Sequence, residues 1–198
     1  LQLIKDELLE LKETYGDDRR TEIIKEFEEF SVEDMIAEED MVITISRDGF
    51  IKRFPVSGYR RQQRNTRGST GAVAKGEDFI EHLFIASTHD YILFFSNLGR
   101  CYWLKVHELP QVGKAGKGRA IINMVQIGND EKIKAFVTVK QFSDDTFLIM
   151  ATRDGLVKKT VLSAYGNPRR DGINAIKINA GDELIEVKLT DGSSDIIL

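Results

Sequence analysis

The sequence predicts a mainly β protein made of propeller-like blades of about 50 residues each, preceded by short α-helices. Two observations carry this prediction. The hydrophobic pattern changes from helical to strand-like spacing after residue 40, and one strand–turn–strand pattern then occurs three times. The chain also has 41% hydrophobic residues among 198, enough to form a core. It contains no apolar run of the roughly 18 residues that a membrane span needs.

The first 40 residues are predicted to be helical. Residues 1–15 form an amphipathic pattern with apolar residues at helical spacing, and Gly16 is expected to end that helix. The stretch 19–30 predicts a second helix, and Ser31 with Asp34 predicts the capped start of a short acidic one. Because acids are interspersed in the first segment, it does not resemble a signal peptide. We take 1–40 as a helical linker.

Residues 41–198 repeat one pattern three times. Similar hairpins are predicted at 42–59, 92–109 and 147–165, with Gly49, Gly99 and Gly155 in their turns. A second repeated string contains Asp78, Asp130 and Asp182, each 52 residues from the next. Each unit is expected to be a hairpin, a long basic loop and further strands, which can bury both sheet faces only beside other units. The stretch 182–198 is interpreted as the start of a fourth unit, so the chain resembles a piece of a longer array.

The charge is unevenly distributed along the chain. The formal net charge is −4, but residues 1–40 contain 15 acidic and 5 basic residues, whereas 41–198 contain 17 acidic and 23 basic ones. Residues 41–76 hold eight basic residues and one acid, Asp48. This asymmetry predicts a polyanionic partner for the basic part. The alternative is an ordinary solvated surface with an excess of lysine.

No catalytic or metal-binding motif is recognisable. His82, His89 and His107 show no metal-ligand spacing with each other or with Cys101, so no metal site is expected. The single cysteine excludes an internal disulfide, fits a reducing compartment and is expected to be buried. The string GKAGKGRA at 113–120 is rich in glycine but lacks the order of a phosphate-binding P-loop.

Nucleic-acid binding is the better-supported function. The loop after the first hairpin combines cations with neutral donors and glycine, which together can meet phosphates without reading bases. The predicted contacts in that loop are Arg60, Arg61, Gln62, Gln63, Arg64, Asn65, Thr66, Arg67, Gly68 and Lys75. The later units add Arg100, Lys105, Lys114, Lys117, Arg119, Lys158, Lys159, Arg169 and Arg170. If the units lie side by side, these cations form a stripe that bends DNA independently of its sequence.

The residues also resemble a known family. Strings such as GEDFIEHLFIASTHDYILFFSNLGRCYWLKVHELP and TRDGLVKKTVL are similar to the C-terminal DNA-wrapping domain of bacterial DNA gyrase A. The segment ELLELKETYGDDRRTEI resembles the link to the preceding cleavage domain, so the resemblance covers essentially the whole chain. It implies a β-pinwheel, a propeller-like disc whose blades exchange strands and bend DNA around a basic rim.

The family's signature box, QRRGGKG, is recognisable but altered. The matching residues are Gln62–Gly68, QQRNTRG, in which Gln62, Arg64 and Gly68 match and Arg67 keeps the charge of a lysine. Asn65 and Thr66 replace two glycines, which bears on the backbone geometry of the loop.

The resemblance implies a role within a larger enzyme. The parent is expected to be an ATP-dependent topoisomerase of the bacterial cytoplasm that introduces negative supercoils with gyrase B as partner, ATP and Mg²⁺ being used elsewhere in the holoenzyme. This chain is then expected to be non-catalytic and without cofactor, because the family's catalytic tyrosine lies upstream of it. The alternatives are a protein-interaction propeller and the related C-terminal domain of topoisomerase IV.

Overall fold

The computed structural model describes residues 2–17, 20–21, 32–59, 78–128, 130–167, 169 and 171–196. The chain divides into two compact units, Leu1–Val32 and Glu33–Leu198, and each is described here by itself.

The described residues of the first unit include the α-helix α1 (Gln2–Tyr15), which confirms the helix predicted for 1–15. Gly16 ends it, and the Gly16 N–H donates to the carbonyl of Lys12 at 2.9 Å. The second predicted helix and Ser31 lie almost entirely outside the described residues. The short acidic helix predicted there is a single 3₁₀ turn, η1 (Val32–Met35), which opens the second unit.

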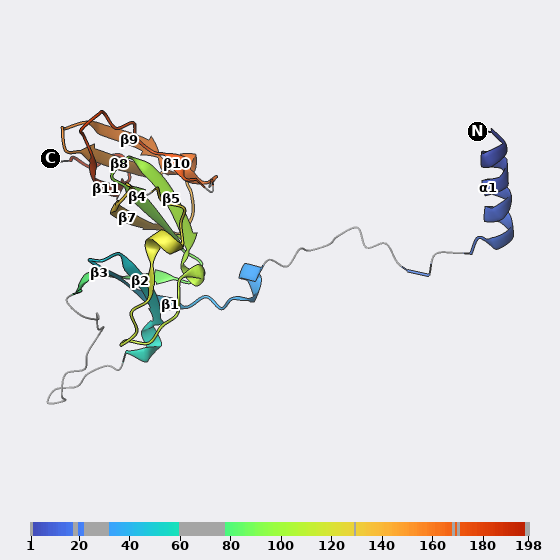
Figure 1. Ribbon diagram of the computed structural model, residues 1–198, viewed down its shortest axis with the longest axis horizontal. Coiled ribbons are helices and arrows are strands. Elements are labelled where there is room, and N and C mark those ends of the chain that lie inside the picture. The colour runs from blue at the N-terminus through green and yellow to red at the C-terminus, as the bar shows by residue number, and fades with distance from the viewer. Residues whose placement is uncertain are drawn as a thin grey trace. The chain divides into compact units, whose positions relative to one another are not determined.

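The second unit is built of antiparallel β-sheets that follow one another in chain order (Figure 1). We number them sheets 1 to 3. Sheet 1 has the order β3-β1-β2-β6, with β1 Asp40–Ser46, β2 Phe50–Pro55, β3 Ile80–Ser87 and β6 Arg119–Ala120. Sheet 2 has the order β10-β5-β4-β7, with β4 Tyr91–Ser96, β5 Arg100–Lys105, β7 Ile133–Val139 and β10 Ile173–Asn174. Sheet 3 has the order β11-β8-β9, with β8 Phe147–Thr152, β9 Val157–Val161 and β11 Leu184–Thr190.

Short 3₁₀ turns follow several of these strands. They are η2 (Val56–Gly58), η3 (Val106–Glu108), η4 (Ile121–Asn123) and η5 (Leu162–Tyr165). The mainly β class and the repeated hairpins are thereby confirmed.

The three hairpin turns share one local design. Gly49, Gly99 and Gly155 have φ values of 78°, 77° and 89°, a region that glycine enters without a Cβ clash. In each turn the hydroxyl before it accepts the amide N–H four residues later, from Phe50 to Ser46, Arg100 to Ser96 and Leu156 to Thr152. The sequence pattern of Ser or Thr, then a turn ending in glycine, therefore has a direct geometric reason.

The outer strand of sheets 1 and 2 comes from the following unit. Strand β6 follows β5 in the chain but pairs with β2, and β10 follows β9 but pairs with β5. Gly118 and Gly172, at φ 83° and 76°, precede these exchanged strands. A Cβ on Gly118 would collide with the carbonyl of Ile51, and one on Gly172 would lie 2.7 Å from the Tyr102 ring. The strand exchange implied by the family resemblance is thus present.

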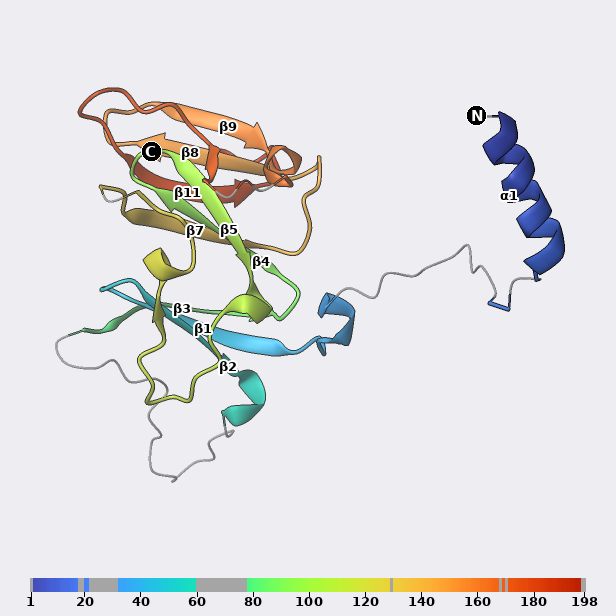
Figure 2. The same cartoon turned by 45° about the vertical axis from the view of Figure 1, so that its right-hand side comes forward.

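Sheet 2 lies between sheets 1 and 3 (Figure 2). Two hydrophobic cores hold the sheets together, one on each face of sheet 2. Ile92 and Phe94 of β4 pack with sheet 1, whereas Leu93 and Phe95 pack with sheet 3. All four side chains are fully buried, which explains why β4 is an unbroken apolar run. Cys101 is buried as expected, and burial raises the pKa of its thiol.

Two details of the predicted repeat are corrected. The segment read as the start of a fourth unit forms β11, which pairs with β8 and belongs to sheet 3. The repeated acid of the second unit is Glu131 rather than Asp130. Ile133 pairs with Ser96 as Ile80 pairs with Ser46, so the residue two positions before each strand partner is Asp78 in one unit and Glu131 in the other. The sequence comparison missed this equivalence because the second unit has a glutamate, one residue after Asp130, at the position where the first unit has an aspartate.

Candidate nucleic-acid interface

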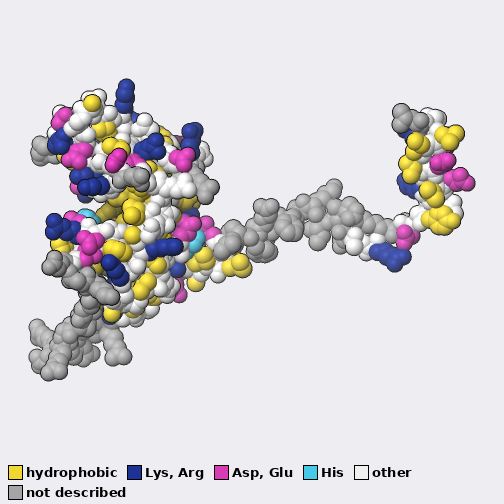
Figure 3. Space-filling view, viewed as in Figure 1, with side chains coloured by type: hydrophobic (Ala, Val, Ile, Leu, Met, Phe, Trp, Pro, Cys, Tyr) yellow, Lys and Arg dark blue, Asp and Glu magenta, His cyan; other side chains and the backbone are white. Residues whose placement is uncertain are grey.

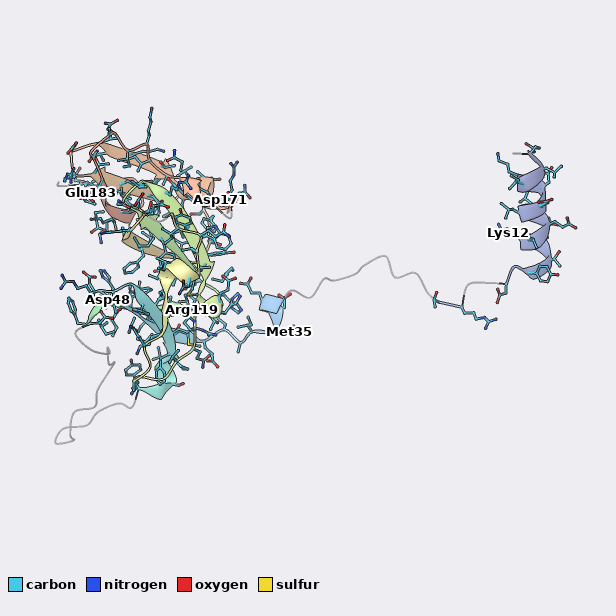
Figure 4. The ribbon with its side chains drawn as sticks, viewed as in Figure 1. Lys12, Met35, Asp48, Arg119, Asp171 and Glu183 are labelled. Atoms are coloured by element: carbon cyan, nitrogen blue, oxygen red, sulfur yellow. The ribbon has the colours of Figure 1, made fainter. Side chains whose placement is uncertain are left out.

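The basic loop that precedes β6 lies beside sheet 1, although the sequence assigned it to the second unit. Lys114 and Lys117 belong to the loop, and Arg119 is the first residue of β6, opposite Ile51 (Figure 4). The strand exchange therefore places these three cations on the same sheet as the hairpin that leads into the predicted DNA-binding loop.

Two of these lysines lie over aromatic rings. The Lys117 Nζ is 3.8 Å from the centroid of the Phe50 ring, and the Lys114 Nζ is 4.2 Å from that of Tyr59. Tyr59 also packs edge-on against Phe54, with ring centroids 5.5 Å apart. In the described part of the chain neither ammonium has a carboxylate within 4.0 Å, so both keep their charge available.

One lysine of the loop contacts the residue before the segment that carries the box residues, and another acts electrostatically on the residue after that segment. Tyr59, under Lys114, immediately precedes residue 60, and Asp78 immediately follows residue 77. The pKa of Asp78 is lowered by the Ser46 hydroxyl and by the amides of Asp48 and Phe79, with a contribution from the positive charge of Lys117. The cations at 113–119 are therefore neighbours of both ends of the predicted loop.

A residue that sequence reasoning missed holds this loop in place. Lys52 is 4% exposed, and its ammonium donates to the carbonyls of Lys114 at 2.9 Å and Gly116 at 2.6 Å. Burial lowers its pKa. The alternation of β2 does not reveal it, because Ile51 faces the core and its neighbour Lys52 therefore points to the opposite face, which the strand pattern alone predicts to be exposed.

Two other predicted cations lie together at the corresponding place on sheet 2. The Arg100 guanidinium donates to the carbonyl of Asp171 at 2.9 Å. Arg100 and Arg169 are both exposed. They line a hollow of about 290 Å³ with Leu98, Asp171, Gly172 and Asn174.

Three predicted contacts are already engaged within the protein. The Lys105 ammonium is 2.6 Å from a Glu33 carboxylate oxygen, 3.2 Å from the His89 carbonyl and 3.7 Å from the centroid of Tyr91. Its side chain is only 14% exposed. Burial lowers the pKa of Lys105, but Glu33 and Tyr91 outweigh burial and the pKa is raised.

The other two engaged cations bind backbone carbonyl groups. Lys158 donates to the carbonyl of Ala175 at 2.6 Å. Lys159 donates to that of Gly192 at 3.0 Å.

The remaining predicted contacts lie outside the described residues. These are Arg60, Arg61, Gln62, Gln63, Arg64, Asn65, Thr66, Arg67, Gly68, Lys75 and Arg170. On the face shown in Figure 3, Lys and Arg side chains alternate with Asp and Glu over the described part of the β unit. The predicted stripe of cations stays a prediction.

The described residues around the loop at 113–119 offer cationic and hydrogen-bonding groups. Within them, no group of three or more His, Cys, Asp or Glu side chains could hold a metal ion. Likewise, no helix of the described ranges is long and apolar enough to cross a bilayer. A hollow of about 680 Å³ is lined by residues 101–104 of β5, residues 122–127, Glu108 and Arg169. What the loop at 113–119 can do is bind an anion.

Comparison with known proteins decides the family. The model of the DNA gyrase C-terminal domain, a beta-propeller, matches residues 40–87, 90–140 and 146–191. This chain belongs to that family. The three matched blocks of the gyrase C-terminal domain correspond to the three repeated units, and the exchanged strands β6 and β10 lie in the block that follows the one supplying the rest of their sheet.

DNA gyrase A proteins of several bacteria are similar over the full chain. The gyrase A protein of Clostridium acetobutylicum is 44% identical over 198 residues, and that of Aeromonas salmonicida is 46% identical over 198 residues. The chain covers all of its own length but only 24% and 22% of these two relatives. It therefore spans about a quarter of the gyrase A proteins that it matches.

Solved structures support the same fold for this gyrase C-terminal domain. A crystal structure of the C-terminal domain of DNA topoisomerase IV matches with a TM-score of 0.66 and 31% identity, covering 80% of this chain and 48% of that one. A structure of the DNA gyrase A C-terminal domain matches with a TM-score of 0.58 and 24% identity, covering 77% and 48%. The second match bears on the fold alone.

Proposed function

We propose that this domain binds duplex DNA and bends it around its basic side, as the wrapping part of a gyrase A protein. In that role it presents DNA to the cleavage gate of the holoenzyme, which then introduces negative supercoils. The observation that carries the proposal is the exchange of β6, which joins the cations at 113–119 to the hairpin that carries the box loop. Contacts of lysine and arginine with phosphates suit binding that is independent of base sequence.

The proposal extends to the setting of the domain. The domain itself is non-catalytic and carries no cofactor, while the parent enzyme works in the bacterial cytoplasm with gyrase B and uses ATP and Mg²⁺ elsewhere. Family membership and the similarity to gyrase A proteins support this setting. The chain's tyrosines (Tyr15, Tyr59, Tyr91, Tyr102 and Tyr165) have no part in strand cleavage, and burial is the largest cause that raises the pKa of Tyr102 and of Tyr165 to about 12.

A second candidate is the corresponding C-terminal domain of a topoisomerase IV, which does not drive negative supercoiling. The topoisomerase IV structure has the higher TM-score of the two compared above, 0.66 against 0.58. The altered box, Gln62–Gly68, also fits this candidate. Identities of 44% and 46% with gyrase A proteins over the full chain favour gyrase.

A ligation experiment separates wrapping from simple binding. Nicked circular DNA is sealed with and without the protein, and the linking-number distribution is read on a gel. A shifted distribution is expected, because DNA bent around a disc follows a path with a fixed hand. Binding that depends on salt but leaves the distribution unchanged would reduce the function to duplex binding without wrapping.

Charge removal in the box loop tests the phosphate contacts. We expect the double substitution Arg64→Ala/Arg67→Ala to weaken binding equally for unrelated sequences. It should reduce the slope of log affinity against log salt by about 2, since each neutralised phosphate contributes about 0.9. The measurement is a salt titration by fluorescence anisotropy on two duplexes of different sequence. An unchanged slope would remove these residues from the interface.

The same titration tests the remaining alternative, a protein-interaction propeller. Binding through phosphates falls steeply with salt, whereas docking of a protein through an apolar patch changes little. Failure to bind any duplex at low salt would favour the protein-interaction alternative.

A further inference from the structure

In the described part of the chain four lysines lie over aromatic rings, and they differ in what else they contact. Lys105 over Tyr91 is neutralised by Glu33, and Lys159 over Phe147, with 4.3 Å between Nζ and ring centroid, donates to the Gly192 carbonyl. Lys114 and Lys117 have their rings but no carboxylate within 4.0 Å among the described residues. Among the described residues, the last two therefore combine a position over a ring with a charge that has no carboxylate within 4.0 Å.

A ring positions a cation without using its hydrogen bonds. The attraction acts between the ammonium and the ring face, so the N–H groups that point away from the ring stay free to donate to a phosphate oxygen. A lysine in solvent loses more side-chain freedom when it binds than one already held in place. An ammonium held over Phe50 or Tyr59 thus meets a phosphate at a smaller entropic cost.

The backbone that carries these lysines is held as well. Lys52 bonds the carbonyls of Lys114 and Gly116, and the Val112 N–H donates to the Arg53 carbonyl at 3.2 Å. Beyond the loop, the Ile121 N–H donates to the Gly49 carbonyl at 3.0 Å. Phe50 and Tyr59 are themselves half-buried, so ring, backbone and ammonium form one ordered group.

We infer that Phe50 and Tyr59 are positioning residues for DNA binding, which hold Lys117 and Lys114 ready for phosphates of the duplex. The inference rests on the proposed DNA-binding function and adds to it two uncharged residues that make no contact with phosphate themselves. It accounts for two aromatic residues that are only half-buried, one at the start of β2 and one just after η2, where a core role would bury them fully.

The test compares variants of the full chain by salt titration with a short duplex. The ring-removing pair Phe50→Leu/Tyr59→Leu should lower affinity by about four- to twenty-fivefold, taking about two- to fivefold per ring. The salt slope should stay unchanged, because the pair keeps every charge. The ring-keeping pair Phe50→Tyr/Tyr59→Phe should bind as the unsubstituted protein does. Phe142→Leu is the matched control, because Phe142 is a half-buried ring that contacts Tyr91 and Trp103 and has no lysine over it among the described contacts.

A second pair, Lys114→Ala/Lys117→Ala, completes a double-mutant cycle. Alone it should lower the salt slope by about 2, and in its background the leucine pair should have no further effect on affinity. The inference is overturned if the leucine pair binds normally, or if its loss persists without the two lysines. An unchanged slope for the alanine pair would instead count against the proposed role of this loop in DNA binding. Melting curves of all variants check that the β unit stays folded, and a leucine pair that unfolds is replaced by the single substitutions.

Discussion

At the scale of single residues, Glu131 shows how one carboxylate supports a blade. It is 8% exposed and accepts from the Ser96 hydroxyl at 2.6 Å, the Tyr102 hydroxyl at 2.7 Å and the Gly128 N–H at 3.0 Å. Burial raises its pKa, but these hydrogen bonds outweigh burial and the pKa is lowered. We expect Glu131→Gln to lower the free energy of unfolding by about 1–3 kcal/mol at pH 7, because an amide cannot accept three such donors.

The pH dependence of this loss has a definite sign. A lowered pKa in the folded state means that the carboxylate stabilises the fold above the usual pKa of glutamate and ceases to do so as the pH falls through its lowered value. The difference in free energy of unfolding between the unsubstituted protein and Glu131→Gln should therefore become smaller below about pH 4.3. Urea unfolding curves at several pH values measure it. A gap that widens on acidification would contradict this role of Glu131.

At the scale of elements, the exchanged strand β6 depends on Gly118. Its left-handed φ and its contact with the Ile51 carbonyl leave no room for a Cβ. We expect Gly118→Ala to lower the free energy of unfolding by about 2–4 kcal/mol, from backbone strain plus the clash. Hydrogen exchange at the Ile121 amide, which bonds the Gly49 carbonyl, should accelerate as β6 loosens from β2.

Gly181 supplies the matched control for this prediction. Its φ of 85° is nearly the same as the 83° of Gly118, but a Cβ there would meet nothing within 4 Å. Gly181→Ala should lower the free energy of unfolding by only about 1–2 kcal/mol, from the strain of the left-handed backbone. It should leave hydrogen exchange at the Ile121 amide unchanged. Equal losses for the two alanines would show that the contact with β2 contributes nothing.

At the scale of the whole molecule, the boundary of the β unit differs from the expected one at residue 40. The compact unit begins at Glu33, and residues 33–39 are tied to the β3–β4 turn. The Thr88 hydroxyl donates to the Ala37 carbonyl at 2.8 Å, and the Thr88 N–H donates to the Glu39 backbone carbonyl at 3.0 Å. The Glu33 carboxylate forms an ion pair with Lys105.

Truncation distinguishes the two boundaries. Removal of residues 1–32 should leave the free energy of unfolding of the β unit unchanged, because the unit keeps these contacts. Removal of residues 1–39 should lower it by about 1–3 kcal/mol, through the lost hydrogen bonds and the unpaired, half-buried Lys105. Thermal melts of both truncated chains measure the difference. If both melt alike, the segment 33–39 does not stabilise the β unit.

Truncation also bears on the acidic linker. We expect that residues 25–40 make no DNA contact of their own, since like charges repel. Duplex affinity should not fall when residues 1–32 are removed, and a rise at low salt would indicate that the acids compete with DNA. A weaker complex would mean that the linker contributes to binding.

The sequence by itself determined the class, the repeat and the helix α1. These features are local patterns, which neighbouring residues determine without tertiary contacts. They are the unbroken apolar run of β4, the three turn glycines and the spacing of the apolar residues in 1–15. It also determined the family, through strings long enough to be specific. The sequence also predicted the cations of the loop 113–119 as a group, but it did not predict that they lie beside sheet 1.

Only the tertiary structure decided which cations lie together and which are already paired. Strand exchange moves Lys114, Lys117 and Arg119 from their own unit to sheet 1, and no local pattern encodes a partner strand some 70 residues away. Glu33 neutralises Lys105 across 72 residues of chain. Burial of Lys52 is likewise a property of packing. The sequence gives the positions of charged side chains along the chain, whereas DNA binding depends on which of those side chains remain without an opposite charge in the folded structure.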